Sequence, residues 1–233
     1  MPESSSILAI LGLAFGLGLT HALDADHIMA VSSLSGSRAS LRDTLHFCGR
    51  WAIGHGLTLL LIGSAVLLLG MALPAELSQL AEMAVGWVLV GLGLYVFWSL
   101  RRTQAHLHYH HHDGVARHAH WHQHDHLPAS SDDHHSHRHH GAVMVGVLHG
   151  MAGSAPLLAI LPLATQSSPW YGMAYLLMFC VGVLLAMLVF GGALGSVFGW
   201  LNRKGHTAVR LVRASVALGT ITLGAYLITG YAA

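Results

Sequence analysis

The sequence contains very few charged residues. Asp, Glu, Lys and Arg make up 9% of its 233 residues, whereas 54% are hydrophobic; a soluble domain carries about 25% charged residues. A soluble helical bundle needs a polar face on each helix, and this composition cannot supply one. Several apolar runs instead reach the roughly 20 residues that cross a hydrocarbon core of about 30 Å. The composition therefore predicts an all-α, polytopic membrane protein.

The sequence is also poor in cysteine and in targeting signals. Its two cysteines, Cys48 and Cys180, lie in or beside apolar segments, so we expect small buried residues and no disulfide framework. The N-terminus "MPESSSILAILG" lacks the basic region of a signal peptide, so we expect a retained first span. The formal net charge of +1 gives no reason to expect nucleic-acid binding. A phosphate-binding loop that would use ATP is also missing.

What the sequence does contain is six apolar segments and one histidine-rich segment. Residues 101–141, between the third and fourth apolar segments, include 15 of the 21 histidines. This low-complexity polar linker cannot bury a core. It divides the chain into a first three-helix repeat (1–100), the His-rich loop and a second three-helix repeat (142–233). The six predicted transmembrane helices cover residues 6–31, 52–73, 79–100, 142–164, 171–198 and 208–231.

The basic residues predict the orientation of these spans. All eleven Lys and Arg residues lie in the connections that follow the first, third and fifth spans or in the first residues of the sixth span. By the positive-inside rule these connections are cytoplasmic and both termini lie outside. We therefore expect a multi-pass protein of the inner (plasma) membrane with a cytoplasmic His-rich loop. The basic residues are Arg38, Arg42, Arg50, Arg101, Arg102, Arg117, Arg138, Arg203, Lys204, Arg210 and Arg213.

An internal repeat supports the division into halves. A shift of 128 residues aligns "GLTHALDAD" with "GVLHGMAGS", so that His21 meets His149, and it also aligns Gly54 with Gly182. A shift of 131 residues aligns "GLY" with "GAY" in the last span of each half. Chance matching between glycine-rich segments is the alternative. A repeat of three spans must be inverted, because an odd number of crossings reverses the side of the membrane, and inverted repeats are a transporter architecture with a midplane site.

The first predicted span contains "HALDADHI", two imidazoles and two carboxylates in an apolar segment. A carboxylate at the centre of a membrane helix costs roughly 2.5–3.5 kcal/mol, which indicates a functional role. Imidazole nitrogen suits nickel, cobalt, zinc and copper. His21 and His27 point about 240° apart on a regular helix, so a shared ion requires a helix break between them, which the glycines of "GLGLT" just upstream favour. Without a break, Asp26 is a partner that orients a histidine. The predicted metal-binding residues are His21, Asp24, Asp26 and His27.

Other histidines lie in or near the spans. His55 in "GHG" and His149 in "LHG" are each followed by a glycine that allows close helix approach, so we expect both to complete the metal site. The alternative for each is a helix-packing residue. His46 is either a ligand near the cytoplasmic side or an interfacial residue, and His206, beside "NRKG", is predicted to be interfacial.

These motifs resemble those of a known family. "HALDADHI" resembles the H-x-x-x-x-D-H signature of the nickel/cobalt transporter (NiCoT) family, with His21, Asp26 and His27 at its fixed positions and Asp24 at a further usual aspartate. "WAIGHGLTLL" resembles that family's second motif, with His55 at its histidine. The segment "LHGMAGSAPLLAILPL" departs from the motif of the larger members and is more similar to the short nickel permeases of urease gene clusters. The resemblance implies passage of Ni²⁺ or Co²⁺, with the residues of "HALDADHI" as the selectivity site.

The His-rich loop differs from an affinity tag, because no run exceeds three histidines and aspartates interrupt them. A spacer without a role is one alternative. We favour a metal-buffering or sensing loop of neutral imidazoles, with a cytoplasmic metallochaperone as its candidate partner. Such loops also occur in related nickel/cobalt efflux proteins, so the loop leaves the direction of transport open, whereas the Asp-His pair of "HALDADHI" favours uptake.

The sequence thus predicts a non-enzymatic permease for Ni²⁺, and for Co²⁺, into the cytoplasm. Its expected partners are the lipid bilayer and the divalent ion, which is a transported substrate, with no resident cofactor and no nucleic acid. The alternatives are nickel or cobalt efflux, zinc transport, an intramembrane metalloenzyme with catalytic zinc, and a metal sensor anchored by the spans.

Overall fold

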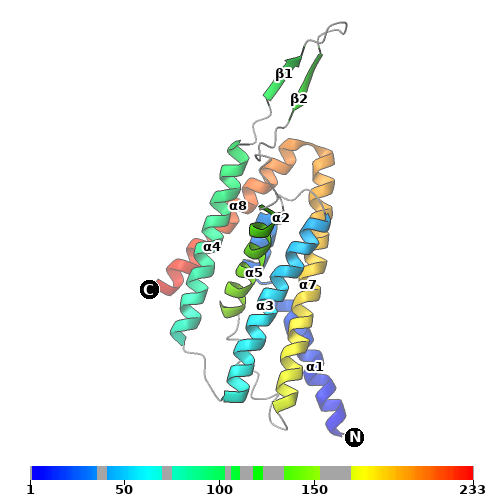
Figure 1. Cartoon of the computed structure of the whole chain (residues 1–233), viewed down its shortest axis with the longest axis vertical. Coiled ribbons are helices and arrows are strands. Elements are labelled where there is room, and N and C mark those ends of the chain that lie inside the picture. Colours follow the sequence, from blue (N-terminus) through cyan, green and yellow to red (C-terminus); the bar gives the residue numbers. More distant parts are fainter. Residues whose placement is uncertain are drawn as a thin grey trace.

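The computed structural model describes seven stretches of the chain, and they are mostly helical (Figure 1). These stretches are residues 2–35, 41–69, 75–102, 106–110, 118–122, 134–152 and 169–232. The helices are α1 (Pro2–His21), α2 (Ala25–Ser35), α3 (Leu41–Leu69), α4 (Ala75–Arg102), α5 (His134–Ala152), α7 (Pro169–Lys204) and α8 (His206–Ala232). Two short strands, β1 (His106–His110) and β2 (His118–His122), pair antiparallel.

Four of these helices, α3, α4, α7 and α8, are long and apolar enough to cross a membrane. Helices α1 and α2 are long and apolar enough together, but a bend separates them, so the described residues hold four candidate spans, or five if this pair is one broken span. The chain is therefore a multi-pass helical membrane protein. The fourth predicted span, 142–164, coincides with the shorter apolar helix Ala142–Ala152 and then continues outside the described residues. The count of six spans stays a prediction.

Several element boundaries differ from those predicted. Helix α3 begins at Leu41, eleven residues before the predicted span, so Arg42 and Arg50 lie on a helix and not in a loop. Helix α5 begins at His134, inside the segment predicted to be a linker. Hydropathy marks only the part of a helix that lies in hydrocarbon, and a helix continues beyond it where its backbone hydrogen bonds can. Most of the remaining His-rich loop lies outside the described residues.

The bundle is held by close helix crossings. Helix α1 packs on α7, and α3 packs on α5 and α7. At the first crossing a Cβ atom on Gly18 would overlap the carbonyl oxygen of Phe179. At the crossing of α3 and α5, a Cβ atom on Gly146 would overlap the carbonyl oxygen of Trp51. Glycine at these positions lets the backbones touch, which is how small residues promote packing in membranes.

Helices α4 and α8 form a similar crossing. A Cβ atom on Gly86 would lie 2.9 Å from the carbonyl oxygen of Gly224, and one on Gly93 would lie 2.7 Å from that of Ala217. Helix α2 packs on α4 and α8, and the hydroxyl groups of Ser33 and Thr220 form a buried 2.8 Å hydrogen bond between α2 and α8. The short helix that follows the break is therefore anchored by its neighbours.

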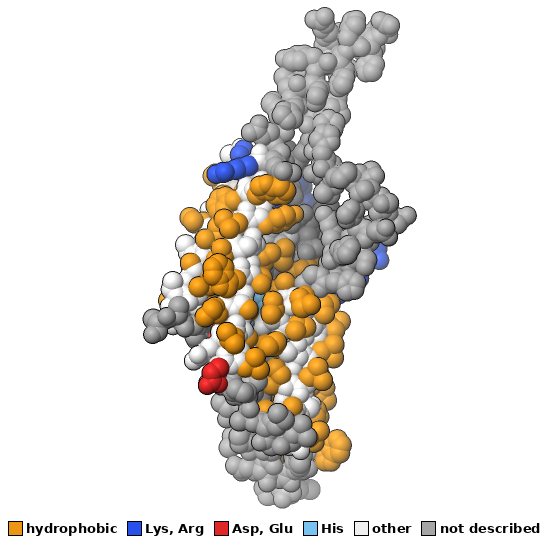
Figure 2. Space-filling view, turned by 60° about the vertical axis from the view of Figure 1, so that its left-hand side comes forward, with side chains coloured by type: hydrophobic (Ala, Val, Ile, Leu, Met, Phe, Trp, Pro, Cys, Tyr) orange, Lys and Arg blue, Asp and Glu red, His pale blue; other side chains and the backbone are white. Residues whose placement is uncertain are grey.

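The outer face of the bundle is apolar. Figure 2 shows hydrophobic side chains along the flanks of the helices and the visible Lys and Arg side chains in the upper half of the view. The first residues of α3 and the last residues of α4 and α7 lie at the end nearest the strands (Figure 1). The arginines Arg42, Arg101 and Arg203 occupy these helix ends. An apolar flank with one basic end suits a protein placed across a bilayer.

Candidate metal site

The site begins where the first predicted span breaks. Helix α1 ends at His21 and α2 begins at Ala25, and the axes of the two helices differ by 53°. A turn joins them, in which the amide of Asp24 donates to the carbonyl oxygen of His21 at 3.0 Å. The predicted break between His21 and His27 is confirmed. Because of this bend, two imidazoles that would diverge on a regular helix can meet.

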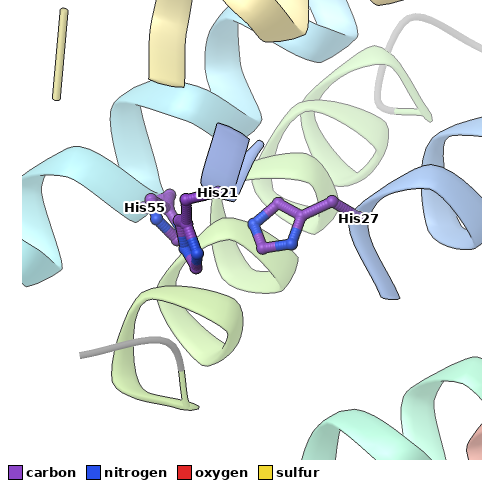
Figure 3. A group of neighbouring side chains, drawn as sticks. All are labelled: His21, His27 and His55. Carbon is purple, nitrogen blue, oxygen red and sulfur yellow. The ribbon is translucent and has the colours of Figure 1, made fainter. Parts of the chain in front are cut away.

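Three histidines converge at the break. One ring nitrogen of each of His21, His27 and His55 lies within 4.8 Å of those of the other two. Figure 3 shows His21 beside His55, with His27 reaching toward them from α2. The ring centroids of His21 and His27 are 4.9 Å apart, and those of His27 and His55 are 5.2 Å apart. Residues 21 and 27 thus meet a histidine contributed by α3.

His149 on α5 is a fourth member of this cluster. Its ring centroid lies 5.1 Å from that of His27. The side chains of His27, His55 and His149 are each 2% exposed or less, and that of His21 is 11% exposed. Four of the six residues predicted for the metal site are therefore brought together as imidazoles in the interior of the bundle.

The Nδ1 atoms of three of these rings face oxygen acceptors. His149 Nδ1 lies 2.9 Å from the carbonyl oxygen of Val145, which only accepts, so this nitrogen donates. His21 Nδ1 lies 2.8 Å from Asp24 Oδ2, and His27 Nδ1 lies 3.1 Å from Asp26 Oδ1. When Nδ1 carries the proton of a neutral imidazole, Nε2 keeps its lone pair.

The Nε2 atoms show the complementary pattern. In His21, His27, His55 and His149 this atom is buried and has no hydrogen-bond partner among the described residues, and the same is true of His55 Nδ1. Buried polar atoms normally have a partner, and an unmade hydrogen bond costs about 1–3 kcal/mol. Five such atoms in one cluster are the pattern expected of a ligand site. A divalent cation is the ligand that several unprotonated imidazole nitrogens would bind together.

The two aspartates lie at the edge of this cluster. The side chain of Asp24 is 56% exposed and that of Asp26 is 25% exposed. Asp26 reaches two histidines, since its second oxygen, Oδ2, lies 3.8 Å from His149 Nε2. The structure therefore brings all six predicted residues together, with the carboxylates mainly against Nδ1 atoms.

Sequence reasoning missed two neighbours of the site. Glu82, on α4, lies within electrostatic range of Asp26; the signal that could have found it is a carboxylate inside a predicted span. Trp51, on α3, is fully buried and stacks on His27; no pattern distinguishes it from other membrane tryptophans. His46 is exposed on α3, and the side chain of His206 lies outside the described part of the chain.

Comparison with known proteins gives the family. Residues 18–222 match the family described as cytochrome c biogenesis protein transmembrane region. The chain is also similar to urease accessory protein UreH of Bacillus sp. (strain TB-90), with 32% identity over 207 residues that cover 87% of this chain and 83% of the relative. No solved structure matches the chain. This multi-pass helical protein belongs to the cytochrome c biogenesis protein transmembrane region family.

Proposed function

We propose that this protein is a permease that carries a divalent transition-metal ion, Ni²⁺ first and Co²⁺ next, across the membrane into the cytoplasm. The observation that carries the proposal is the cluster of four histidines from four helices, whose Nε2 atoms are buried and have no hydrogen-bond partner among the described residues. An ion that leaves water must exchange its water ligands for protein ligands. Imidazole nitrogens in the interior of an apolar bundle supply them, and imidazole suits nickel and cobalt.

In this proposal the histidines and the aspartates have different roles. His21, His27, His55 and His149 bind the ion through nitrogen. Asp24 and Asp26 accept the Nδ1 protons of His21 and His27, at 2.8 Å and 3.1 Å, and so orient the rings and make Nε2 more electron-rich. Metal-bound histidines commonly have such a carboxylate partner. The negative charge of the two carboxylates also attracts the cation.

The relative and the sequence motifs support nickel as the transported ion. The relative is a urease accessory protein by name. "HALDADHI" and "WAIGHGLTLL" resemble motifs of the nickel/cobalt transporters, and "LHGMAGSAPLLAILPL" in the second half of the chain is more similar to the nickel permeases of urease gene clusters. The basic helix ends favour a cytoplasmic location for the strand-bearing end of the bundle. This orientation leaves both termini outside.

Repeated contacts support an architecture of two inverted three-helix halves. The ring of His21 lies 5.5 Å from that of Phe179, and the ring of His149 lies 5.0 Å from that of Trp51. A shift of 128 residues converts each pair into the other. The glycine contacts between α1 and α7 and between α3 and α5 are related by the same shift, and those between α4 and α8 by a shift of 131. Inverted repeats place a transport site between the halves.

The family description raises a second candidate, a role in cytochrome c biogenesis, and the geometry disfavours such a role through a disulfide between the two cysteines. Cys48 on α3 packs beside Gly191, whereas Cys180 on α7 packs beside Gly56. The eight residues from 48 to 56 on α3 span about 12 Å along the helix. Two cysteines can form a disulfide only when their Cα atoms lie within roughly 7 Å. A redox role for this pair would require a large rearrangement.

Accumulation of radioactive Ni²⁺ tests the proposal. Cells that express the wild type at trace metal should accumulate more Ni²⁺ than cells with an empty vector, and His27→Ala should abolish the gain. His46→Ala is the matched control, since His46 is exposed on α3, and it should keep the gain. Lower accumulation than the vector would instead indicate an exporter. Equal accumulation in all cells, with the protein present in the membrane, would refute transport. Competition by Co²⁺ and Zn²⁺ ranks the three ions by their preference for the transporter.

The His-rich loop receives or buffers the ion in this proposal. In the part of the loop that the structure describes, β1 and β2 pair so that positions 106, 108 and 110 stand opposite 122, 120 and 118, and all six are histidine. Removing residues 106–140 should reduce uptake at low metal and leave the maximal flux. Complete loss of flux from a correctly inserted variant would place the loop in the transport path.

A further inference from the structure

Trp51 is the aromatic neighbour of two histidines of the site. Its side chain is fully buried on α3, one helical turn before His55. The indole ring stacks on the imidazole of His27, with centroids 5.7 Å apart and planes within 6°. It meets the imidazole of His149 edge-on, at 5.0 Å and 69°. One side chain thus contacts imidazoles from both α2 and α5.

The surrounding helices are shaped to hold this indole. A Cβ atom on Gly146 would lie 2.7 Å from Cδ1 of Trp51, so any side chain at that position would displace the ring. The ring of Phe47, one turn earlier on α3, lies 5.8 Å away with its plane inclined by 61° to the indole. Aromatic contacts of this kind contribute about 0.5–1.5 kcal/mol each beyond burial. The indole has little freedom to turn.

Hydrogen bonding does not account for a tryptophan at this position. The indole Nε1 is buried and has no hydrogen-bond partner among the described residues, which costs about 1–3 kcal/mol. A phenylalanine or leucine would avoid that cost. The large flat ring that contacts both His27 and His149 is the property that a smaller side chain would lose.

The two imidazoles are constrained by this ring and by their Nδ1 partners together. Asp26 holds one edge of His27, and the indole covers one of its faces. The carbonyl oxygen of Val145 holds Nδ1 of His149, and the indole lies against that ring as well. A ring held at an edge and at a face has little freedom to rotate. Ligands fixed in advance bind more tightly, because less freedom is lost on binding.

We propose that Trp51 is a positioning residue of the metal site, which fixes the planes of His27 and His149 so that their Nε2 atoms face one ion. This inference rests on the proposed metal site and adds a determinant of its affinity and ligand geometry. Trp51 itself contributes no ligand, because the indole nitrogen donates only.

Co²⁺ titration of the purified protein in detergent tests this role, because bound Co²⁺ reports its ligand geometry through visible absorption. Trp51→Phe keeps an aromatic face and should bind Co²⁺ with an unchanged spectrum. Trp51→Leu removes that face and should raise the dissociation constant about 10- to 100-fold, the usual effect of losing a residue that orients a metal ligand, and alter the spectrum. Thermal unfolding without metal checks that each variant is folded.

A second measurement does not depend on the leucine variant. In a protein whose other five tryptophans are replaced by phenylalanine, Ni²⁺ should quench the fluorescence of Trp51. A matched variant that keeps only Trp200, which is 53% exposed on α7, should show no saturable quenching at the same Ni²⁺ concentrations.

The outcomes separate the two proposals. If the wild type binds no Co²⁺ or Ni²⁺, the proposed metal site is wrong and the inference falls with it. If the wild type binds Co²⁺ but Trp51→Leu binds it equally well with the same spectrum, only the positioning role is refuted. If Trp51→Leu does not fold, unquenched fluorescence of Trp51 in a nickel-binding protein overturns the inference, and saturable quenching supports it.

Discussion

Replacing Asp26 with asparagine tests how the carboxylates contribute to the site. The asparagine side chain has the same shape and can still accept the Nδ1 proton of His27, so the substitution removes charge and little else. Oδ2 of Asp26 lies 3.8 Å from His149 Nε2, which places an ion bound to that nitrogen about 6 Å or less from the carboxylate. At an effective dielectric constant of about 20, a divalent ion and a carboxylate about 6 Å apart attract each other by roughly 5 kcal/mol before desolvation.

Desolvation of the carboxylate and the ion offsets much of this attraction. The net loss expected for Asp26→Asn is about 10- to 100-fold in metal affinity, as found when the carboxylate partner of a metal-binding histidine is removed. Asp24→Asn is the matched control, because the Asp24 side chain is 56% exposed and water screens an exposed charge. We expect Asp24→Asn to lower the affinity by less than Asp26→Asn does.

Equilibrium dialysis of the purified variants against radioactive Ni²⁺ measures both dissociation constants at one pH and ionic strength. An Asp24→Asn variant that loses as much affinity as Asp26→Asn would refute the argument from burial. Unchanged affinity in both variants would refute an electrostatic contribution of the carboxylates.

Three further outcomes follow from the packing. Gly18→Val should lower the thermal unfolding midpoint in detergent, because overpacking costs about 1–3 kcal/mol or more. Gly91→Val is the control and should change the midpoint little, since no atom lies within 4 Å of an added Cβ. Equal midpoints for the two variants would contradict the close crossing of α1 and α7. Ser33→Ala should lower the free energy of unfolding by about 0.6–1.5 kcal/mol, because it removes the α2–α8 hydrogen bond. The same thermal unfolding measures this loss, and an unchanged midpoint would contradict it. His149→Ala should weaken Ni²⁺ binding at least tenfold in equilibrium dialysis while leaving a folded protein, and wild-type affinity would exclude His149 from the site.

The broken first span shows how far sequence reasoning reached. The spacing of His21 and His27 required a break if both were to meet one ion, and α1 and α2 meet at that place with a bend of 53°. The different roles of the two neighbouring aspartates could not be predicted from the sequence, since Asp24 and Asp26 have the same chemistry. Only the fold leaves Asp24 half-exposed and Asp26 three-quarters buried. Glu82 could have been predicted from its place in an apolar span, but it was missed.

By itself the sequence determined that the chain is a helical membrane protein, which residues are candidates to bind a borderline divalent metal, and that the first helix must break between His21 and His27 if both are to meet one ion. These properties depend on composition, residue chemistry and spacing along one segment, all of which are local. The tertiary structure decided that His55 and His149 join His21 and His27, that Asp26 reaches two of these rings, and that Trp51 contacts both His27 and His149. These features depend on helix crossings at which glycines allow the backbones to touch, so they arise only when segments more than a hundred residues apart pack together.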